Sequence, residues 1–587
     1  MRFGQLDINP ARNPGILDTA TWDRAAAWAS VQAVDNGLWQ TSLGRPLSAA
    51  GDVLASRYGI TLHAASEAYH GASRYVLASL PDSQDVLLRL GPIGDEGPLG
   101  EPAGIKEIDG GNVIAVYPTD AAAVARLLRR LASAAGPRAL GAAPRLGVGA
   151  RMTTAAWPAI WQVMRERSVA TNAIQNSVRE LYLLDTLLSG QPPETNTAFG
   201  FGTIETGYTG STFEGLWLAG ALAGLKAGSL RDVAYGADAD HIQVKRGAQG
   251  LTRAKRLLDA ARYYSFYTLD VSDVLDYAAI ALTSTAASEA LLAAVIPDAV
   301  ERSAFVAYHR QAGSLGGYDY HPAEAELGRL VGKYWTALAA VEELHQHLLA
   351  LKDGVPFDLE LSIDEHPNEI PAFDCLTTEA ELCFVLLEAR SRGIPLTHVA
   401  PNYGVEKGTD YRCPDGLPGL AARSRSLGRI AEEFGVMPDY HSGDDLGRET
   451  RRVIGRATGG RCHFKVSPML QLLFGEVLTR FHPDLFRRWW FDALAYARRA
   501  AAGGSAFAAD CLRQDAVTEP LTLSEAGLEA AAHGQVFHHF SFAFVGRRDA
   551  SGSFLNREEF YSLSPAFYHA YQDRLVGYLG ELAEDLF

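Results

Sequence analysis

The stretch FDLELSIDEHPNEIPAFDCLTTEAELCFVLLEARSRGIPLTHVAPNYG, residues 357–404, decides the fold class. It opens with an apolar, strand-like run at Phe357–His366, continues with a helical pattern at Leu376–Arg392 and closes with a second strand-like run at Leu396–Gly404. Strands that alternate with helices of this length are typical of βα units in a parallel sheet. The sequence therefore predicts an α/β fold.

The same alternation continues in both directions and predicts eight strands. Eight βα units indicate a (β/α)8 barrel of the TIM type. The gap between Leu275 and Lys352 is far longer than one crossover, so we expect an all-helical insertion at about 275–352. The expected strands are Arg145–Met152, Thr171–Ser177, Val233–Val244, Tyr263–Ser272, Phe357–His366, Leu396–Gly404, Met437–Asp445 and Arg461–Pro468.

Three regions are expected along the chain. Residues 1–144 form a small mixed α+β region, residues 145–510 form the catalytic barrel with its insertion, and residues 511–587 form a C-terminal extension packed on the barrel. In the first region, β-prone runs predict strands and an Asp N-cap predicts a helix. These elements are Ser73–Leu80, Gln84–Leu90, Asn112–Pro118 and the helix Asp120–Ala135.

Composition excludes several classes of protein. The 587 residues carry 53 Lys and Arg against 69 Asp and Glu, a net charge of −16, which argues against a nucleic-acid partner. Five cysteines without a CxxC pair indicate neither a disulfide framework nor structural zinc, and favour a reducing compartment. The N-terminus carries no secretory pattern, and the apolar stretch Tyr277–Val300 is interpreted as a packed helix. We expect a cytoplasmic protein without a membrane partner.

Polar residues gather at the ends of six expected strands. Active residues of such barrels come from the C-terminal strand ends and the loops after them. A cluster of His with Asp or Glu suits a divalent cation such as Mn, Fe, Ni, Co or Zn. The residues concerned are Asp238, Asp240, His241, Asp270, Asp273, Asp364, Glu365, His366, Asn402, Glu406, Lys407, His441, Asp444, Asp445, His463 and Lys465.

Three histidines are the candidate metal ligands. His241, His441 and His463 each end a different expected strand, and three imidazoles leave coordination positions open for catalysis. The alternative for each is an ordinary hydrogen-bonded histidine. His538 and His539, in GQVFHHFSFAF, either pack in a C-terminal strand or reach the rim, and the sequence leaves both open.

Two carboxylates are candidates for acid–base catalysis. Asp240 and Glu406 follow the third and sixth strands, about opposite across an eight-stranded ring. The alternative is a structural pairing with Lys407, Arg179 or a backbone amide. Asp238 is a candidate for orienting an imidazole.

Motifs for other chemistries are missing from the sequence. Gly200-Phe201-Gly202 lacks the spacing and the preceding strand of a dinucleotide fingerprint, and neither a Walker-type phosphate loop nor a serine nucleophile elbow is present. The pair Trp489-Trp490 lies at helical spacing and is interpreted as part of a core.

At these same residues the sequence resembles the tagaturonate epimerases, metal-dependent enzymes that interconvert tagaturonate and fructuronate. The resemblance implies a barrel epimerase, an isomerase, whose divalent metal is held by His241, His441 and His463. It further implies Asp240 as the base and Glu406 as the acid, or the reverse. The strongest matches are QNSVRE (175–180), GADADHIQV (236–244), SIDE (362–365), APNYGVEKGTDY (400–411), HSGDD (441–445) and HFK (463–465); weaker ones are YTLDVSD (267–273), FRRWW (486–490) and VFHHFSF (536–542).

The expected partner is a small-molecule sugar or sugar acid, and a homo-oligomer stays open. We expect the substrate-binding residues among polar side chains of the matching motifs. They are Gln175, Arg179, Lys407, Ser442, Asp445 and Lys465.

The chain departs from the family pattern where substrate should bind. Asn402 stands where the family favours Arg, Asp444 where it favours Ser, and Leu446 where it favours Lys; Val466-Ser467-Pro468 replaces a Thr-Ala-Gly run. Two cationic side chains are lost and one anionic side chain is gained. Because an unpaired buried carboxylate is costly, we expect a related ketose or sugar acid as the substrate, without strict dependence on a uronate carboxylate.

Two chemical routes and two other classes of protein remain open. Tagaturonate and fructuronate differ at a carbon β to the ketone, which favours retro-aldol cleavage and re-addition; direct deprotonation applies if the inverted carbon lies nearer the ketone. The alternatives are a metal-dependent aldolase or lyase on a related sugar, and a non-catalytic sugar-binding relative. Retention of the three histidines argues against the last.

Overall fold

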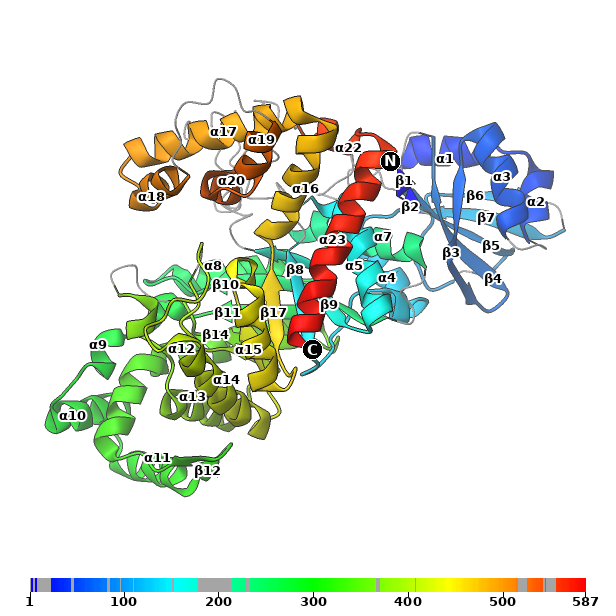
Figure 1. Cartoon of the computed structure of the whole chain (residues 1–587). Helices are drawn as coiled ribbons and strands as arrows, with labels where there is room; N and C mark the ends of the chain where they lie inside the picture. Colours follow the sequence, from blue (N-terminus) through cyan, green and yellow to red (C-terminus); the bar gives the residue numbers. More distant parts are fainter. Residues whose placement is uncertain are drawn as a thin grey trace.

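Eight parallel strands close into a barrel at the centre of the molecule (Figure 1). The computed structural model describes residues 2–3, 6–7, 23–43, 47–81, 85–95, 97–108, 110–149, 152–177, 213–228, 233–365, 370–406, 408–515, 525–541, 544 and 556–587. The predicted (β/α)8 barrel is confirmed. Its strands are β8 (Arg145–Gly149), β9 (Ala170–Ser177), β10 (Tyr235–Gln243), β11 (Phe266–Asp270), β14 (Asp358–Ser362), β15 (His398–Ala400), β16 (Met437–Tyr440) and β17 (His463–Val466).

The interior of the barrel is polar, whereas its outer face packs on helices. On β10, Asp238 and Asp240 both reach the Lys465 ammonium on β17, a strand that is not a neighbour of β10 in the sheet. These side chains therefore point across the interior. Ala237 and Ala239, which alternate with these aspartates, belong to the main hydrophobic core. Successive side chains of a strand alternate between the two faces, so a polar residue at every second position fills the barrel.

The outer ring of helices is completed by the C-terminal end of the chain. Helix α23 lies against α15 and α5 and so fills the eighth position, as Figure 1 shows for the red helix beside the barrel. Arg451 and Arg452 on α15 both donate to the buried Asp585 carboxylate near the end of α23. The ring consists of α5 (Thr153–Arg167), α7 (Phe213–Ala227), α8 (Gly250–Ala260), α12 (Glu324–Lys352), α13 (Glu379–Ser391), α14 (Gly416–Glu433), α15 (Arg448–Thr458) and α23 (Pro565–Leu586).

The insertion before β14 is mostly helical, but it is not all-helical. It contains α9 (Tyr277–Ile280), α10 (Thr285–Val295) and α11 (Ala299–Gln311), and these are followed by a hairpin of β12 (Gly313–Leu315) and β13 (Tyr318–Tyr320). The turn of this hairpin is Gly316-Gly317, both with positive φ, as a tight antiparallel turn requires. The stretch 277–300, expected as one packed helix, is divided among three helices. Among the described residues, no helix is long and apolar enough to cross a membrane.

The N-terminal region has a core of its own. The three expected strands are present as β4, β5 and β7, but two more strands, β3 and β6, extend the sheet to the order β3-β4-β5-β7-β6. The Ala-rich sequence of β3 has weak strand propensity, which explains why it is not recognised. The expected helix after Asp120 is α4 (Ala121–Arg130), capped by Asp120. The sheet consists of β3 (Thr61–His70), β4 (Ser73–Ser79), β5 (Asp85–Pro92), β6 (Gly104–Ile108) and β7 (Asn112–Tyr117), covered by α1 (Arg24–Gln32), α2 (Asn36–Leu43) and α3 (Leu47–Tyr58).

A group of helices follows β17 and lies beyond the C-terminal end of that strand, above the barrel in Figure 1. Trp489 and Trp490 are buried within this group, so their interpretation as core residues is confirmed. The VFHHF segment forms helix α20, and the strand considered for it is wrong. The helices are α16 (Pro468–Phe481), α17 (Pro483–Ala502), α18 (Ala506–Gln514), α19 (Glu525–Ala532), α20 (Gln535–Phe540) and α22 (Arg557–Tyr561).

Candidate active site

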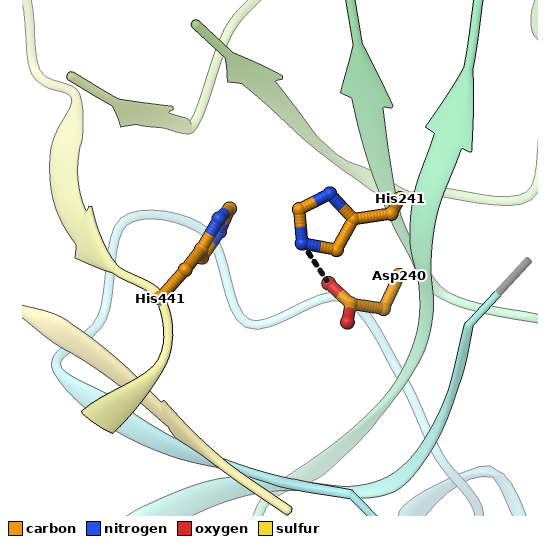
Figure 2. Close-up of side chains that lie close together, drawn as sticks. All are labelled: Asp240, His241 and His441. Atoms are coloured by element: carbon orange, nitrogen blue, oxygen red, sulfur yellow. Dashed lines mark ion pairs between the residues drawn. The ribbon is translucent and has the colours of Figure 1, made fainter. Parts of the chain in front are cut away.

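Two of the predicted histidines and one predicted carboxylate come together at the barrel mouth. Asp240, His241 and His441 each offer one ligand atom, and these three atoms lie within 4.8 Å of one another. Figure 2 shows Asp240 and His241 on β10 facing His441, which follows β16. His241 has a positive φ of 54°, and the register of β10 shifts between Ala239 and Ile242. This irregularity explains how two consecutive residues of one strand both face the site.

The geometry of this group fits a divalent cation. His241 Nδ1 lies 3.3 Å from Asp270 Oδ2, so a carboxylate orients the ring. His241 Nε2 lies 3.9 Å from Asp240 Oδ1, the pair marked by the dashed line in Figure 2. A carboxylate behind a histidine is a recurrent support for imidazole ligands. One carboxylate oxygen and two imidazole nitrogens suit Mn, Fe, Co, Ni or Zn.

His463 lies elsewhere, and its expected position at the end of a strand is wrong. It is the first residue of β17, fully buried, and it groups with His398 and Asp439. Its Nδ1 lies 2.8 Å from Asp439 Oδ2. Burial, together with the nearby positive charge of Lys465, holds the pKa of His463 well below its usual value. The nearby Arg145 guanidinium adds a positive charge that would oppose a metal ion at this deeper position.

A buried lysine connects the carboxylates at the bottom of the site. The Lys465 ammonium donates to Asp240 Oδ1 at 2.9 Å and to Glu360 Oε2 at 2.6 Å, and it lies 3.3 Å from Asp238 Oδ2. It also donates to Thr268 Oγ1 at 2.8 Å. Burial alone would lower the pKa of Lys465, but the surrounding carboxylates raise it well above its usual value. Lys465, expected to bind substrate, therefore bonds to protein oxygens.

The two aspartates of β10 have opposite electrostatic environments. Burial raises the pKa of Asp238 to about 7, although the nearby Lys465 counteracts it. For Asp240, burial also raises the pKa, but Lys465, His241 and His441 together outweigh burial and bring the pKa below its usual value. Asp240 is thus ionised near neutral pH, as a proton acceptor must be. Asp238 contacts Lys465 and Thr268, and in the described residues it does not orient an imidazole as expected.

His441 lies between two carboxylates. Its Nε2 is 2.7 Å from Glu360 Oε1, and its Nδ1 is 2.9 Å from Asp364 Oδ2. Burial lowers the pKa of His441, but Asp364 and Glu360 raise it well above the usual value. The ring is therefore held from both sides, which fixes its orientation toward His241; the ring centroids are 4.7 Å apart.

The other predicted site residues have varied surroundings. Gln175 Nε2 donates to Asp240 Oδ2 at 3.3 Å, so it touches the candidate base. Ser442, with a positive φ of 56°, forms the turn after His441. Asp445 accepts the Gly408 amide at 2.7 Å. Arg179 and Lys407 lie outside the described residues.

Glu406 lies in the loop after β15 and is largely buried. Both of its carboxylate oxygens accept from Arg412, at 2.7 and 3.1 Å, and Arg412 itself is exposed. A pairing with a cation was the structural alternative for Glu406, although the partner is Arg412 and not Lys407 or Arg179. Its role as the acid stays a prediction.

Two residues that depart from the family pattern, Asn402 and Asp444, form hydrogen bonds with backbone groups of the protein. The Asn402 amide donates to the carbonyl oxygens of Ala372 and Cys375, and its oxygen accepts the Gly404 amide. The Asp444 carboxylate accepts the backbone amides of Ser467 and Met469 at the start of α16. Both side chains therefore hold loops together at the rim.

Sequence reasoning missed Glu360, Thr268 and Asp439, three interior residues of the site. Each lies in the middle of a strand and below the rim, where strand ends alone do not point to it. A usable signal was present in β14 and the two residues after it, where Asp358, Glu360, Ser362 and Asp364 alternate with apolar residues. In a parallel barrel this period places all four on the interior face.

An eight-stranded barrel with a carboxylate–imidazole cluster at the C-terminal strand ends defines a (β/α)8 enzyme that acts on a small molecule. Residues 100–584 match the family model of tagaturonate epimerase, UxaE, and the chain belongs to this family. It is therefore a carbohydrate epimerase, an enzyme of the isomerase class. No curated protein sequence matches the chain.

Crystal structures of fructuronate-tagaturonate epimerase UxaE from Cohnella laeviribosi have a similar fold. The form with one glycerol superposes with a TM-score of 0.67 at 20% sequence identity. The matched region covers 92% of this chain and 99% of the Cohnella laeviribosi chain. The native form gives 0.66 at 20% identity with the same coverage, and the form with two glycerols gives 0.65 at 19% identity, again with 92% and 99% covered. At this level of identity, the likeness supports the fold.

Proposed function

We propose that the protein interconverts two epimers of a keto sugar acid of the tagaturonate–fructuronate type. Family membership supports the reaction class, and one observation carries the assignment of the site. The ionised Asp240 carboxylate is held by Lys465 and Gln175 directly beside the two histidines at the barrel mouth. A base next to a cation site is what reversible cleavage of a hydroxy ketone requires.

The chemistry of the substrate favours retro-aldol cleavage. The carbon that distinguishes tagaturonate from fructuronate is β to the ketone, so its hydrogen is not acidified by that carbonyl. Asp240 removes the hydroxyl proton at this carbon, the O–H electron pair forms an aldehyde, and the C–C bond pair passes to the ketone fragment as an enediolate. The aldehyde turns, the bond re-forms on its other face, and Glu406 protonates the new alkoxide. Asp240 then releases its proton to solvent and Glu406 takes one up, which restores both groups for the next turnover.

His241 and His441, with one oxygen of Asp240, would hold the divalent cation, which leaves the other Asp240 oxygen to act as the base. His441 would have to give up its contact with Asp364 or Glu360 to free a nitrogen for the cation. His463 stays a predicted ligand that this arrangement does not support. When bound, such a cation supplies positive charge for the oxyanion that develops on the substrate. Lys465 keeps Asp240 ionised and oriented. Glu406 would move the second proton, which requires that it leave Arg412 during turnover, because a carboxylate bonded to a guanidinium is a poor proton donor.

The residues near the barrel mouth also bear on whether the substrate must carry a carboxylate. Asn402 and Leu446 carry no positive charge, and Asn402 uses its amide on backbone carbonyls. We therefore propose that the enzyme also accepts the uncharged ketose. Comparable turnover of tagaturonate and tagatose by the purified, metal-loaded protein is the expected result, and strict dependence on the carboxylate would overturn this part.

The route is tested by turnover of tagaturonate in deuterated water, followed by NMR. Retro-aldol epimerisation leaves the inverted carbon with its original hydrogen, whereas direct deprotonation introduces deuterium there. Accumulation of free aldehyde would instead favour an aldolase or lyase.

The two catalytic residues are tested by substitution. Asp240→Asn and Glu406→Gln should each lower kcat by about 100-fold or more, the usual contribution of acid–base catalysis. The matched control is Glu343→Gln, a half-exposed carboxylate paired with Lys255 on the helical ring.

A further inference from the structure

Helix α20, in the group of helices that follows β17, brings a histidine to the rim of the barrel. His538 Nδ1 lies 3.5 Å from Asp445 Oδ1, and His538 is only 7% exposed. Asp445 belongs to the short turn after β16, so this contact joins a residue near the C-terminus to the loop that follows His441. Asp445 was expected to bind substrate, but one of its carboxylate oxygens contacts His538.

The other oxygen of Asp445 holds the loop that carries Glu406. Asp445 Oδ2 accepts the Gly408 amide at 2.7 Å. Gly408 has a φ of +82°, and a Cβ at this position would lie 3.1 Å from His539 Nε2. Glycine is therefore needed here both for the backbone conformation and for the close approach of α20. Glu406 precedes this point by two residues.

Helix α20 is itself firmly placed. The Asp515 carboxylate accepts the Gln535 and Val536 amides, both at 2.7 Å. Phe537 is fully buried and packs against Trp489 with ring centroids 4.9 Å apart. The His538 and His539 rings stack on each other at 4.3 Å, which limits how far His538 turns. The helix thus provides a rigid support for the contact with Asp445.

We propose that His538 is a positioning residue that acts through Asp445 to hold the 404–411 loop, and with it Glu406, at the active site. The inference rests on the proposed function, because Glu406 matters only if it transfers a proton there. It adds a function for the segment that follows the barrel: α20 fixes the loop that carries Glu406. Displacement of a catalytic group by about 1 Å costs up to about 100-fold in rate, so a moderate effect is expected.

The structural part is tested without substrate. Hydrogen–deuterium exchange of a peptide covering residues 404–411, which includes the Gly408 amide, is compared in wild type, His538→Ala and His538→Gln. Exchange should accelerate in H538A and return most of the way in H538Q, because glutamine still donates to Asp445. Unchanged exchange in H538A would overturn the proposal. His533→Gln, an exposed histidine just before α20, is the matched control.

The functional part is a double-mutant cycle on the metal-loaded enzyme with tagaturonate. H538A and Asp445→Ala should each lower kcat about tenfold with KM within about twofold, and the double variant should lose no more than either single variant. Additive losses, or a rise in KM alone, would overturn the positioning role. If Glu406→Gln turns over normally, the proposed acid is wrong, while the exchange experiment still decides whether His538 holds the loop.

Discussion

The Lys465 ammonium lies 2.9 Å from the Asp240 carboxylate, with only 4% of the lysine side chain exposed. This ion pair joins β17 to β10 across the barrel interior, and Glu360 and Asp238 share the same ammonium. The contact therefore serves both the fold and the site. It neutralises acidic groups that would otherwise repel one another, and it keeps Asp240 ionised.

Replacing Lys465 by Met should be strongly destabilising, because it leaves several buried carboxylates without a cation. We expect a loss of about 3–5 kcal/mol in the free energy of unfolding, measured by urea denaturation. The control is Lys245→Met, which removes a half-exposed ion pair with Asp273 and should cost less than about 1 kcal/mol. Equal losses in the free energy of unfolding would show that the buried Lys465 contributes no more stability than an exposed ion pair.

Variants of the two histidine groups show which of the groups binds the metal. His241→Asn should abolish stoichiometric binding of a divalent cation, whereas His463→Asn should retain it, since His463 lies beside Lys465 and Arg145 in another group. Asp270→Asn removes the support of His241 and should weaken binding by about 10- to 100-fold. Metal content is measured by elemental analysis, and circular dichroism confirms that each variant is folded. Loss of metal from a folded H463N protein would instead support the metal site formed by His241, His441 and His463.

The barrel and much of its rim could be predicted because both follow from short-range patterns. Apolar runs mark the strands, and the C-terminal ends of parallel strands meet at one edge, so Asp240, His241 and His441 were expected together. His463 was misplaced because it stands near the start of its expected strand, Arg461–Pro468, and not at the C-terminal end, where the rim lies. Two residues along a strand span about 6.6 Å, so His463 and Lys465 lie in different layers of the interior.

The contacts between distant loops could not be predicted from sequence patterns. Asp445 bonds to Gly408 and His538, which come from two other parts of the chain, and its acidic side chain alone indicated only a polar site. The same holds for Asn402, whose partners lie on a loop before α13. Period-two polarity in β14 would have found Glu360, but only once the strand is known to face the interior.

Asp444 should stabilise the protein by capping α16. Its carboxylate accepts the Ser467 amide at 2.9 Å and the Met469 amide at 2.8 Å, so Asp444→Ala leaves two amides at a helix N-terminus without this acceptor. We expect a loss of about 1–2 kcal/mol in the free energy of unfolding. Asp444→Ser, which installs the residue of the family pattern, should recover part of the loss. Asp484→Ala, at an exposed site in the first turn of α17, is the control and should cost less.

Acid sensitivity should come in part from His345 on α12. This imidazole is 3% exposed, and in the described part of the chain neither of its nitrogens has a hydrogen-bond partner. Burial lowers the pKa of His345 below its ordinary value. The unfolded chain then binds a proton more readily than the folded protein, so the stabilising effect of neutral burial is present above about pH 6.5 and is lost as the pH falls toward the lower folded-state pKa.

His345→Leu removes this titration and keeps a side chain of similar size. The melting temperature of H345L relative to wild type should therefore increase as the pH falls from about 8 to about 5, a range that spans the ordinary pKa of histidine. The difference at the higher pH, where the imidazole is neutral in both states, serves as the internal reference for packing changes. Differential scanning calorimetry at constant ionic strength measures both values. A difference that stays constant, or that shrinks in acid, would mean that the burial of His345 does not contribute to acid unfolding.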